Sequence, residues 1–152
     1  MNGAFTRLTV DELANAIMDP DWALDQSYEW LQQPASLDLY KSWNGVQFLL
    51  AAAGAPIDLV LGGTELTATE WGYGPPRYFT PPEVLTGAEF LARTPWERIA
   101  AGYDPDRMLA EGVYGVWGGP DELEELRGYV TRTVDFYAAA AESSDAVLAW
   151  LW

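Results

Sequence analysis

The sequence predicts an α+β fold: a single domain over residues 1–152, in which several helices pack around a small mixed sheet. Three observations indicate it. Capping patterns mark several helix starts, short apolar runs near both ends of the chain are typical of strands, and no linker or low-complexity tract interrupts the 152 residues. A chain of this length can bury one sizeable core.

The N-terminal third is expected to contain one strand and two helices, over residues 3–8, 9–18 and 22–33. Thr9 and Glu12 form the T-x-x-E pattern of a capping box, which opens the first helix. Pro20 ends that helix, because a proline cannot donate the next backbone hydrogen bond. Asp21 is expected to cap the second helix, and Pro34 to close it.

The stretch Leu37–Gly54 is predicted to be the central helix of the fold. Its apolar side chains follow the spacing of one helical face: Leu39, Trp43, Val46, Leu50 and Ala53. Ser36 can cap the start of this helix, and Gly54 followed by Pro56 can end it.

Three polar residues, Lys41, Asn44 and Gln47, recur on a face beside that apolar stripe. Lys41 is the only lysine of the chain. We expect its stem to be buried and its ammonium group to pair with a carboxylate such as Asp38, one turn earlier. The alternative is a catalytic lysine, acting as a base or as a Schiff-base amine.

The rest of the chain is expected to combine short strands, helices and one folded loop. Strands are expected over residues 57–63, 77–79 and 146–152, helices over 80–93, 94–101, 104–111 and 120–142, and the loop over 64–76. Thr80, Pro81 and Glu83 give a strong helix start. The uncharged tail Ala146–Trp152 is predicted to be an inner strand, buried on both faces.

The chain is strongly acidic, with 23 Asp and Glu against 8 Lys and Arg and a net charge of −15. Such a surface repels phosphate backbones and anionic lipids, so neither nucleic acid nor a membrane is an expected partner. The acidity is explained either by solubility alone or by a basic protein partner.

With no cysteine, no apolar run of about 20 residues and no signal-peptide pattern, we expect a cytoplasmic location.

The sequence excludes several kinds of active site. It has no histidine and no cysteine, which removes Ser-His-Asp and Cys-His catalysis and histidine-bound zinc. It has no glycine-rich phosphate loop and no EF-hand spacing, so we expect no cofactor and no metal. A glycoside hydrolase with a carboxylate pair stays open, using Glu65, Glu70 or Glu83 beside Trp71 and Tyr73.

The other charged residues that could have a role are Arg77 and several acids. Arg77 either locks the 64–76 loop through an ion pair or anchors an anionic ligand. The acids between residues 121 and 125 lie in the first turns of the last helix, where the helix dipole favours negative charge. Glu65 and Glu70 have no capping role, so these two are the acids expected to contact a basic partner.

Two long segments resemble the YfbM-like family, a bacterial domain of unknown function. Leu37–Leu50, LDLYKSWNGVQFLL, is similar to the family pattern LDLDKxWxxLHFLLTG, and Gly72–Val84, GYGPPRYFTPPEV, is similar to its GYGPARYLTPEEV. Tyr114 and Trp117 fit its YP…W element, and Phe136–Ala140 fits its C-terminal helix. The resemblance spans nearly the whole chain. It implies an α+β domain of several helices around a small sheet, and it implies no reaction.

The chain departs from the family pattern at two positions. The family usually has histidine where this chain has Gln47, and often aspartate where it has Tyr40. Chemistry that such a histidine performed in relatives would be lost here.

The leading functional hypothesis is a non-catalytic, cytoplasmic binding domain, with a concavity between the predicted central helix and the 64–77 loop. The first alternative is an immunity-type protein that covers the basic cleft of a toxin, and the second is the glycoside hydrolase. The candidate ligand- or partner-binding residues are Asp38, Lys41, Gln47, Glu65, Glu70, Trp71, Tyr73 and Arg77.

Overall fold

The computed structural model describes residues 1–152 and contains five strands and seven helices. The strands are β1 (Gly3–Leu8), β2 (Ser36–Tyr40), β3 (Thr64–Glu65), β4 (Arg77–Phe79) and β5 (Ala146–Leu151). The helices are α1 (Val10–Met18), α2 (Pro20–Trp30), α3 (Trp43–Ala52), α4 (Pro81–Arg93), α5 (Trp96–Ala100), α6 (Pro105–Ala110) and α7 (Pro120–Glu142). None of these helices combines the length and apolar character that a bilayer crossing requires.

The strands form one sheet in the order β2-β1-β5-β4-β3, and every neighbouring pair is antiparallel. The α+β prediction is confirmed, although the sheet is antiparallel throughout and not mixed. The last strand of the chain occupies the middle of the sheet, between β1 and β4. Five of its six residues are buried, which confirms the predicted inner strand.

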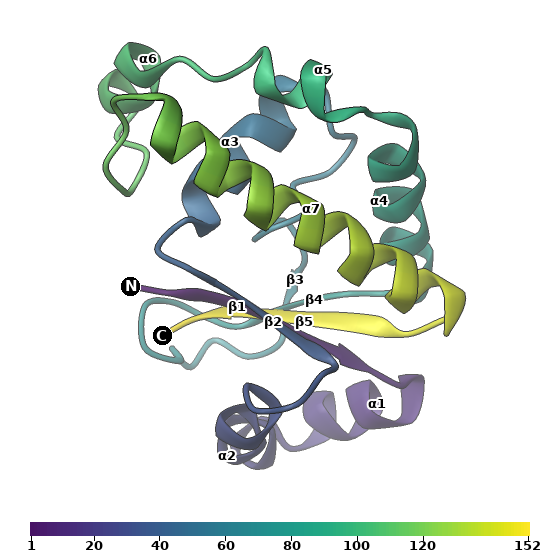
Figure 1. Cartoon of the computed structure of the whole chain (residues 1–152). Coiled ribbons are helices and arrows are strands. Elements are labelled where there is room, and N and C mark those ends of the chain that lie inside the picture. Colours follow the sequence, from purple (N-terminus) through teal and green to yellow (C-terminus); the bar gives the residue numbers. More distant parts are fainter.

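Helices cover both faces of the sheet (Figure 1). Helices α1 and α2 lie on one face, and α3 to α7 lie on the other. The larger core, of 24 buried residues, lies under α3, α4 and α7, and a smaller core of 9 buried residues lies between the sheet and α1–α2. Tyr137 of α7 is fully buried in the larger core, where its ring contacts Phe5, Phe79 and Phe136.

The predicted central helix over Leu37–Gly54 is wrong in its first third. Residues 36–40 form β2, which pairs with β1, and the helix α3 begins only at Trp43. Within β2 the side chains alternate, with Leu37 and Leu39 buried. Tyr40 has a φ of 47°, in the left-handed region that turns the chain from strand into helix.

The predicted strand over residues 57–63 is also wrong. The segment is a series of turns, fixed by Asp58, whose Oδ1 accepts hydrogen bonds from the backbone N–H groups of Val60 and Leu61. Leu59 and Val60 are nevertheless buried in the larger core. The apolar run therefore marks burial and not strand geometry.

Most helix starts follow the predicted caps. The Thr9–Glu12 capping box opens α1, Glu83 accepts hydrogen bonds from Thr80 at the start of α4, and α7 spans the predicted residues 120–142. The cap of α2 differs from its prediction by two positions. Asp19, and not Asp21, caps α2, because its carboxylate accepts the N–H of Trp22. Pro95 precedes α5, while the Thr94 hydroxyl donates back to the Phe90 carbonyl.

Candidate functional site

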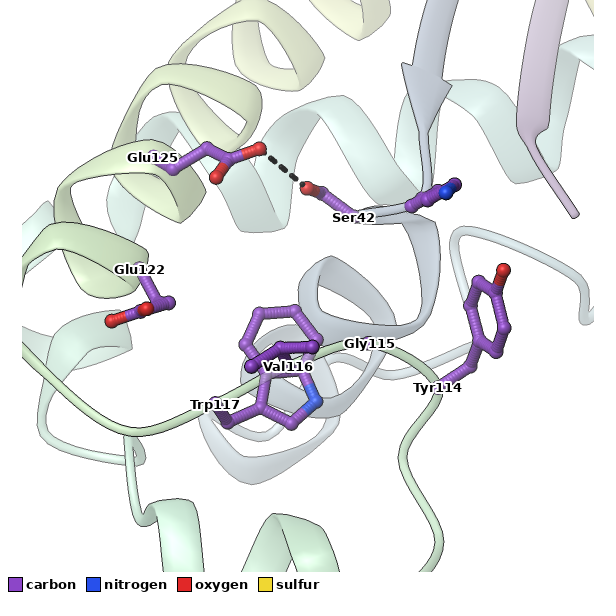
Figure 2. Close-up of a pocket in the computed structure, with 8 residues that line it drawn as sticks. Ser42, Tyr114, Gly115, Val116, Trp117, Glu122 and Glu125 are labelled. Atoms are coloured by element: carbon purple, nitrogen blue, oxygen red, sulfur yellow. Dashed lines mark hydrogen bonds between the residues drawn. The ribbon is translucent and has the colours of Figure 1, made fainter.

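The largest cavity, of about 480 Å³, opens between the start of α3, the loop that precedes α7, and the first turns of α7 (Figure 2). We call it the carboxylate–aromatic cavity. Eight residues line it: Lys41, Ser42, Tyr114, Gly115, Val116, Trp117, Glu122 and Glu125. They come from three segments that are far apart in the sequence.

The two carboxylates of the cavity lie on one face of α7. Glu122 and Glu125 are separated by three positions, which places them one above the other on a helix. The Ser42 hydroxyl donates a hydrogen bond of 3.2 Å to Glu125 Oε1. Figure 2 shows the Glu125 side chain reaching toward Ser42, with Glu122 on the same helix and without a bond to the other residues drawn. The site therefore joins α7 to the start of α3.

The aromatic wall is fixed by close packing. The Trp117 indole N–H donates to the Val113 carbonyl at 3.1 Å. Gly45 of α3 lies under this ring, and a Cβ at Gly45 would come within 2.4 Å of the Trp117 ring. Such a contact is too short for any side chain, so the approach of α3 to Trp117 requires glycine.

Tyr114 forms the other side of the wall. Its ring stacks on Trp43 with centroids 6.3 Å apart, and its backbone N–H donates to Asn44 Oδ1 at 2.7 Å. The N-terminal ammonium group of Met1 donates to the Tyr114 hydroxyl at 3.3 Å. Tyr114 is therefore tied to α3 and to the first residue of the chain.

Lys41 lines the same cavity, but it is exposed and has no carboxylate within ion-pair distance. The predicted pair with Asp38 is wrong, because the two residues lie on a strand and a turn and not on one helix face. Asp38 Oδ1 accepts the backbone N–H of Tyr40 at 2.7 Å instead. Burial raises the pKa of the Asp38 carboxyl, against the smaller opposing effects of that hydrogen bond and of Arg132.

Gln47 belongs to a network of side-chain hydrogen bonds next to the cavity. The Asn44 amide donates to Gln47 Oε1 at 2.7 Å, and the Gln47 amide donates to Asp58 Oδ2 at 2.6 Å. Because Asp58 also accepts backbone hydrogen bonds within the 57–63 turns, this hydrogen-bond network links α3 to that segment. Gln47 therefore has a clear structural role at the position where the YfbM-like pattern has histidine.

The loop over residues 64–76 is clamped at its base. Arg77 forms a 2.7 Å ion pair with Glu65 and donates to the Gly63 carbonyl at 2.8 Å, so the ion-pair interpretation of Arg77 is confirmed. Trp71 is buried against Trp150, which shows that the loop folds back on the body. Tyr73, in contrast, is exposed.

The three carboxylates proposed for a glycoside hydrolase have separate surroundings and share no cavity. Glu65 is paired with Arg77, Glu83 caps α4, and Glu70 is exposed. None of the three lines any of the five main cavities. The predicted concavity between α3 and this loop is likewise replaced by the carboxylate–aromatic cavity, to which the loop contributes no residue.

The comparison with known families gives one decisive result. The family model for a domain of unknown function, DUF1877, matches residues 1–150. The chain belongs to the DUF1877 family. No curated protein matches the sequence.

A solved structure supports the same assignment at the level of the fold. The crystal structure of YfbM, a protein of unknown function from Escherichia coli, is similar with a TM-score of 0.71 and 17% sequence identity, over 98% of each chain. This confirms the resemblance to the YfbM-like family and the α+β fold. Both the DUF1877 family and YfbM are of unknown function, which agrees with the expectation that no activity is established.

Sequence reasoning missed the two carboxylates of this DUF1877 domain. The helix dipole explains why Glu122 and Glu125 occur at the start of α7, but it does not account for their place in a cavity. Their spacing indicates that they share a face. Only the tertiary structure shows that this face meets Ser42 and Trp117, which come from other segments.

A buried Lys41 paired with a carboxylate would be needed for stability, but Lys41 is exposed and unpaired. We expect Lys41→Met to leave the free energy of unfolding within about 0.5 kcal/mol of the parent, because no pair is broken at this exposed position. Thermal melts of the two proteins check this. A clear loss of stability would show that Lys41 has a partner in solution.

Proposed function

We propose that this DUF1877 domain is a non-catalytic binding domain, and that its carboxylate–aromatic cavity receives a cationic side chain from a basic protein. One observation carries the proposal. Glu122, Glu125 and Trp117 line the same cavity, which at about 480 Å³ is the largest of the five main cavities. The proposal includes a bacterial cytoplasmic setting, supported by the absence of cysteine and by the similarity to a protein of Escherichia coli.

The residue types of the cavity suit a guanidinium or ammonium group. Carboxylates accept short, charge-assisted hydrogen bonds from such groups, and these are among the stronger hydrogen bonds in proteins. An indole face attracts a cation through its quadrupole. Trp117 is held in place by its hydrogen bond to Val113, so binding would not have to order it.

The charge of the whole chain supports the same class of partner. A net charge of −15 creates a field that attracts cations and accelerates their encounter with the surface. Lys41 is the one opposing charge in the lining. The cavity therefore holds two negative groups and one positive group, and the Lys41 charge should weaken the binding of a cation.

The test measures the affinity of a fluorescently labelled nona-arginine peptide by anisotropy, at low and at physiological salt. We expect the double variant Glu122→Gln, Glu125→Gln to bind at least about tenfold more weakly, because hydrogen bonds to charged groups contribute roughly 1.5–3 kcal/mol. Lys41→Gln should bind more tightly. The parent protein should bind the peptide more weakly at physiological salt than at low salt, because salt screens the attraction between the charges.

The matched control is Glu65→Gln, Glu70→Gln, which removes the same formal charge from residues outside the cavity. We expect its affinity to change less than about threefold, because Glu65 and Glu70 lie outside the cavity and would attract the peptide only at long range. If both double variants bind the peptide more weakly than the parent by the same factor, binding depends only on the overall charge and the proposed site is wrong. A weaker complex with Lys41→Gln would also contradict it.

A further inference from the structure

A second cavity, of about 260 Å³, lies on the other side of the molecule, at α2. Figure 1 places α2 across the sheet from α3 and α7. Eight residues line this cavity, which we call the tryptophan cavity, and they come from α2 and its C-cap, the 64–76 loop, β5 and the last residue: Leu24, Ser27, Tyr28, Leu31, Trp71, Gly72, Trp150 and Trp152. None of these side chains is charged.

The floor of the tryptophan cavity is rigid. Trp71 and Trp150 pack edge to face with centroids 6.3 Å apart, and they are only 3% and 2% exposed. Gly72 holds the loop against β5, where a Cβ would come within 2.9 Å of the Leu151 carbonyl oxygen. The rim is open, because Tyr28 and Trp152 are exposed at 69% and 42%.

Two of the tryptophans that line the cavity have indole N–H groups that are free to donate a hydrogen bond. The indole N–H of Trp43 is fully buried and has no hydrogen-bond partner, and it is the only indole N–H of this kind. The indole N–H of Trp117 donates to the Val113 carbonyl. The indole N–H groups of Trp71 and Trp150 have no hydrogen-bond partner in the chain and are not fully buried. Each N–H group is therefore accessible to solvent, although the side chain that carries it is nearly buried. Both side chains line this cavity and no other main cavity.

The residue types that line the cavity indicate which class of ligand it can bind. Six of the eight lining residues are hydrophobic, which favours a flat apolar ring, and such pockets use a few polar groups to orient what they bind. An anion has no cation to pair with and meets the field of a chain with a net charge of −15. A sugar would leave most of its hydroxyl groups unpaired against apolar walls.

We propose that the tryptophan cavity binds a small neutral aromatic molecule that carries a hydrogen-bond acceptor, with the ring between Tyr28 and Trp152 and the acceptor toward the indole N–H groups of Trp71 and Trp150. The inference does not depend on the proposed function, because the two cavities share no residue.

The test titrates ¹⁵N-labelled protein with benzamide and follows the indole N–H signals by NMR. We expect saturable shifts of the Trp71 and Trp150 signals, with a dissociation constant on the order of millimolar for so small a molecule. The signals of Trp43 and Trp96 should not move. Benzoate, which adds a negative charge to the same ring, should bind more weakly.

Two exposed tyrosines give a matched pair of variants. Tyr28→Ala removes part of the rim and should weaken benzamide binding about three- to tenfold, the range of one aromatic contact. Tyr73→Ala removes another exposed tyrosine, 59% exposed against 69% for Tyr28, that lies outside the cavity, and it should have no effect. Glu122→Gln with Glu125→Gln should leave benzamide binding unchanged.

Several outcomes would overturn the inference. Benzamide without effect on Trp71 and Trp150, equal losses in Tyr28→Ala and Tyr73→Ala, or benzoate binding as tightly as benzamide would each do so. Methyl glucoside shifting the same two signals at lower concentration than benzamide would assign the cavity to sugars instead. Tyr28 is exposed, so its variant is expected to fold and the comparison stays interpretable.

Discussion

A chain that ends at Leu148, without Ala149–Trp152, is expected to lose its cooperative fold. These residues complete β5, the middle strand, in which Ala149 pairs with Phe5 and with Arg77. Trp150 belongs to the smaller core, and removing one buried large aromatic side chain costs about 3–5 kcal/mol. The free-energy cost of losing Trp150 and the strand pairing together approaches the roughly 5–15 kcal/mol by which a typical domain is stable.

Circular dichroism melts and one-dimensional NMR check this expectation. The truncated protein should be insoluble, or it should show a broad transition and poorly dispersed signals. A control chain that ends at Leu151 keeps all of β5 and should retain a sharp transition. If the shorter chain stays soluble and melts as sharply as the control, the C-terminal strand is peripheral and the expectation fails.

Replacement of Tyr137 by alanine is expected to destabilise the protein by about 3–5 kcal/mol, the cost of a large cavity in a core. Tyr137 is fully buried among three other aromatic rings, and its hydroxyl donates a 2.6 Å hydrogen bond to the Leu59 carbonyl. Burial, followed by the charges of Asp58 and Glu83, raises the pKa of Tyr137 far above its ordinary value, so the hydroxyl stays a donor.

The variant Tyr137→Phe separates packing from the hydrogen bond. It keeps the ring and removes only the donor, so it should cost about 1–3 kcal/mol. Urea unfolding of both variants, with the exposed Leu85→Ala as a control for an apolar truncation outside the core, measures these differences. Equal losses in Tyr137→Ala and Tyr137→Phe would show that the ring contributes nothing, contrary to its buried position.

The candidate site is only partly predictable from the sequence. Helical spacing makes Asp38, Lys41 and Gln47 neighbours on one helix, whereas the structure places Asp38 in β2, Lys41 in a turn and Gln47 in α3. Only Lys41 of the predicted residues reaches the carboxylate–aromatic cavity. Trp71 reaches the tryptophan cavity, where its partner Trp150 is expected from the sequence only as part of a strand. Cavities join segments far apart in the sequence, so local spacing could not place them.

The sequence by itself determined the features that depend on neighbouring residues. The capping boxes at Thr9 and Thr80 set helix starts, because a side chain three positions away satisfies the free backbone groups. The uncharged tail Ala146–Leu151 required burial, and so became the inner strand. The composition of the chain also set the negative field of the surface.

Only the tertiary structure decided the conformation of residues 36–42 and 57–63. Leu39 and Trp43 fit one helical face, yet Leu37 and Leu39 equally fit one face of a strand, and pairing with β1 selects the strand. In the second segment the Asp58 carboxylate satisfies the backbone groups that a strand would have paired. Local spacing allowed both conformations in each segment, and the choice came from hydrogen bonds and packing that the spacing alone does not encode.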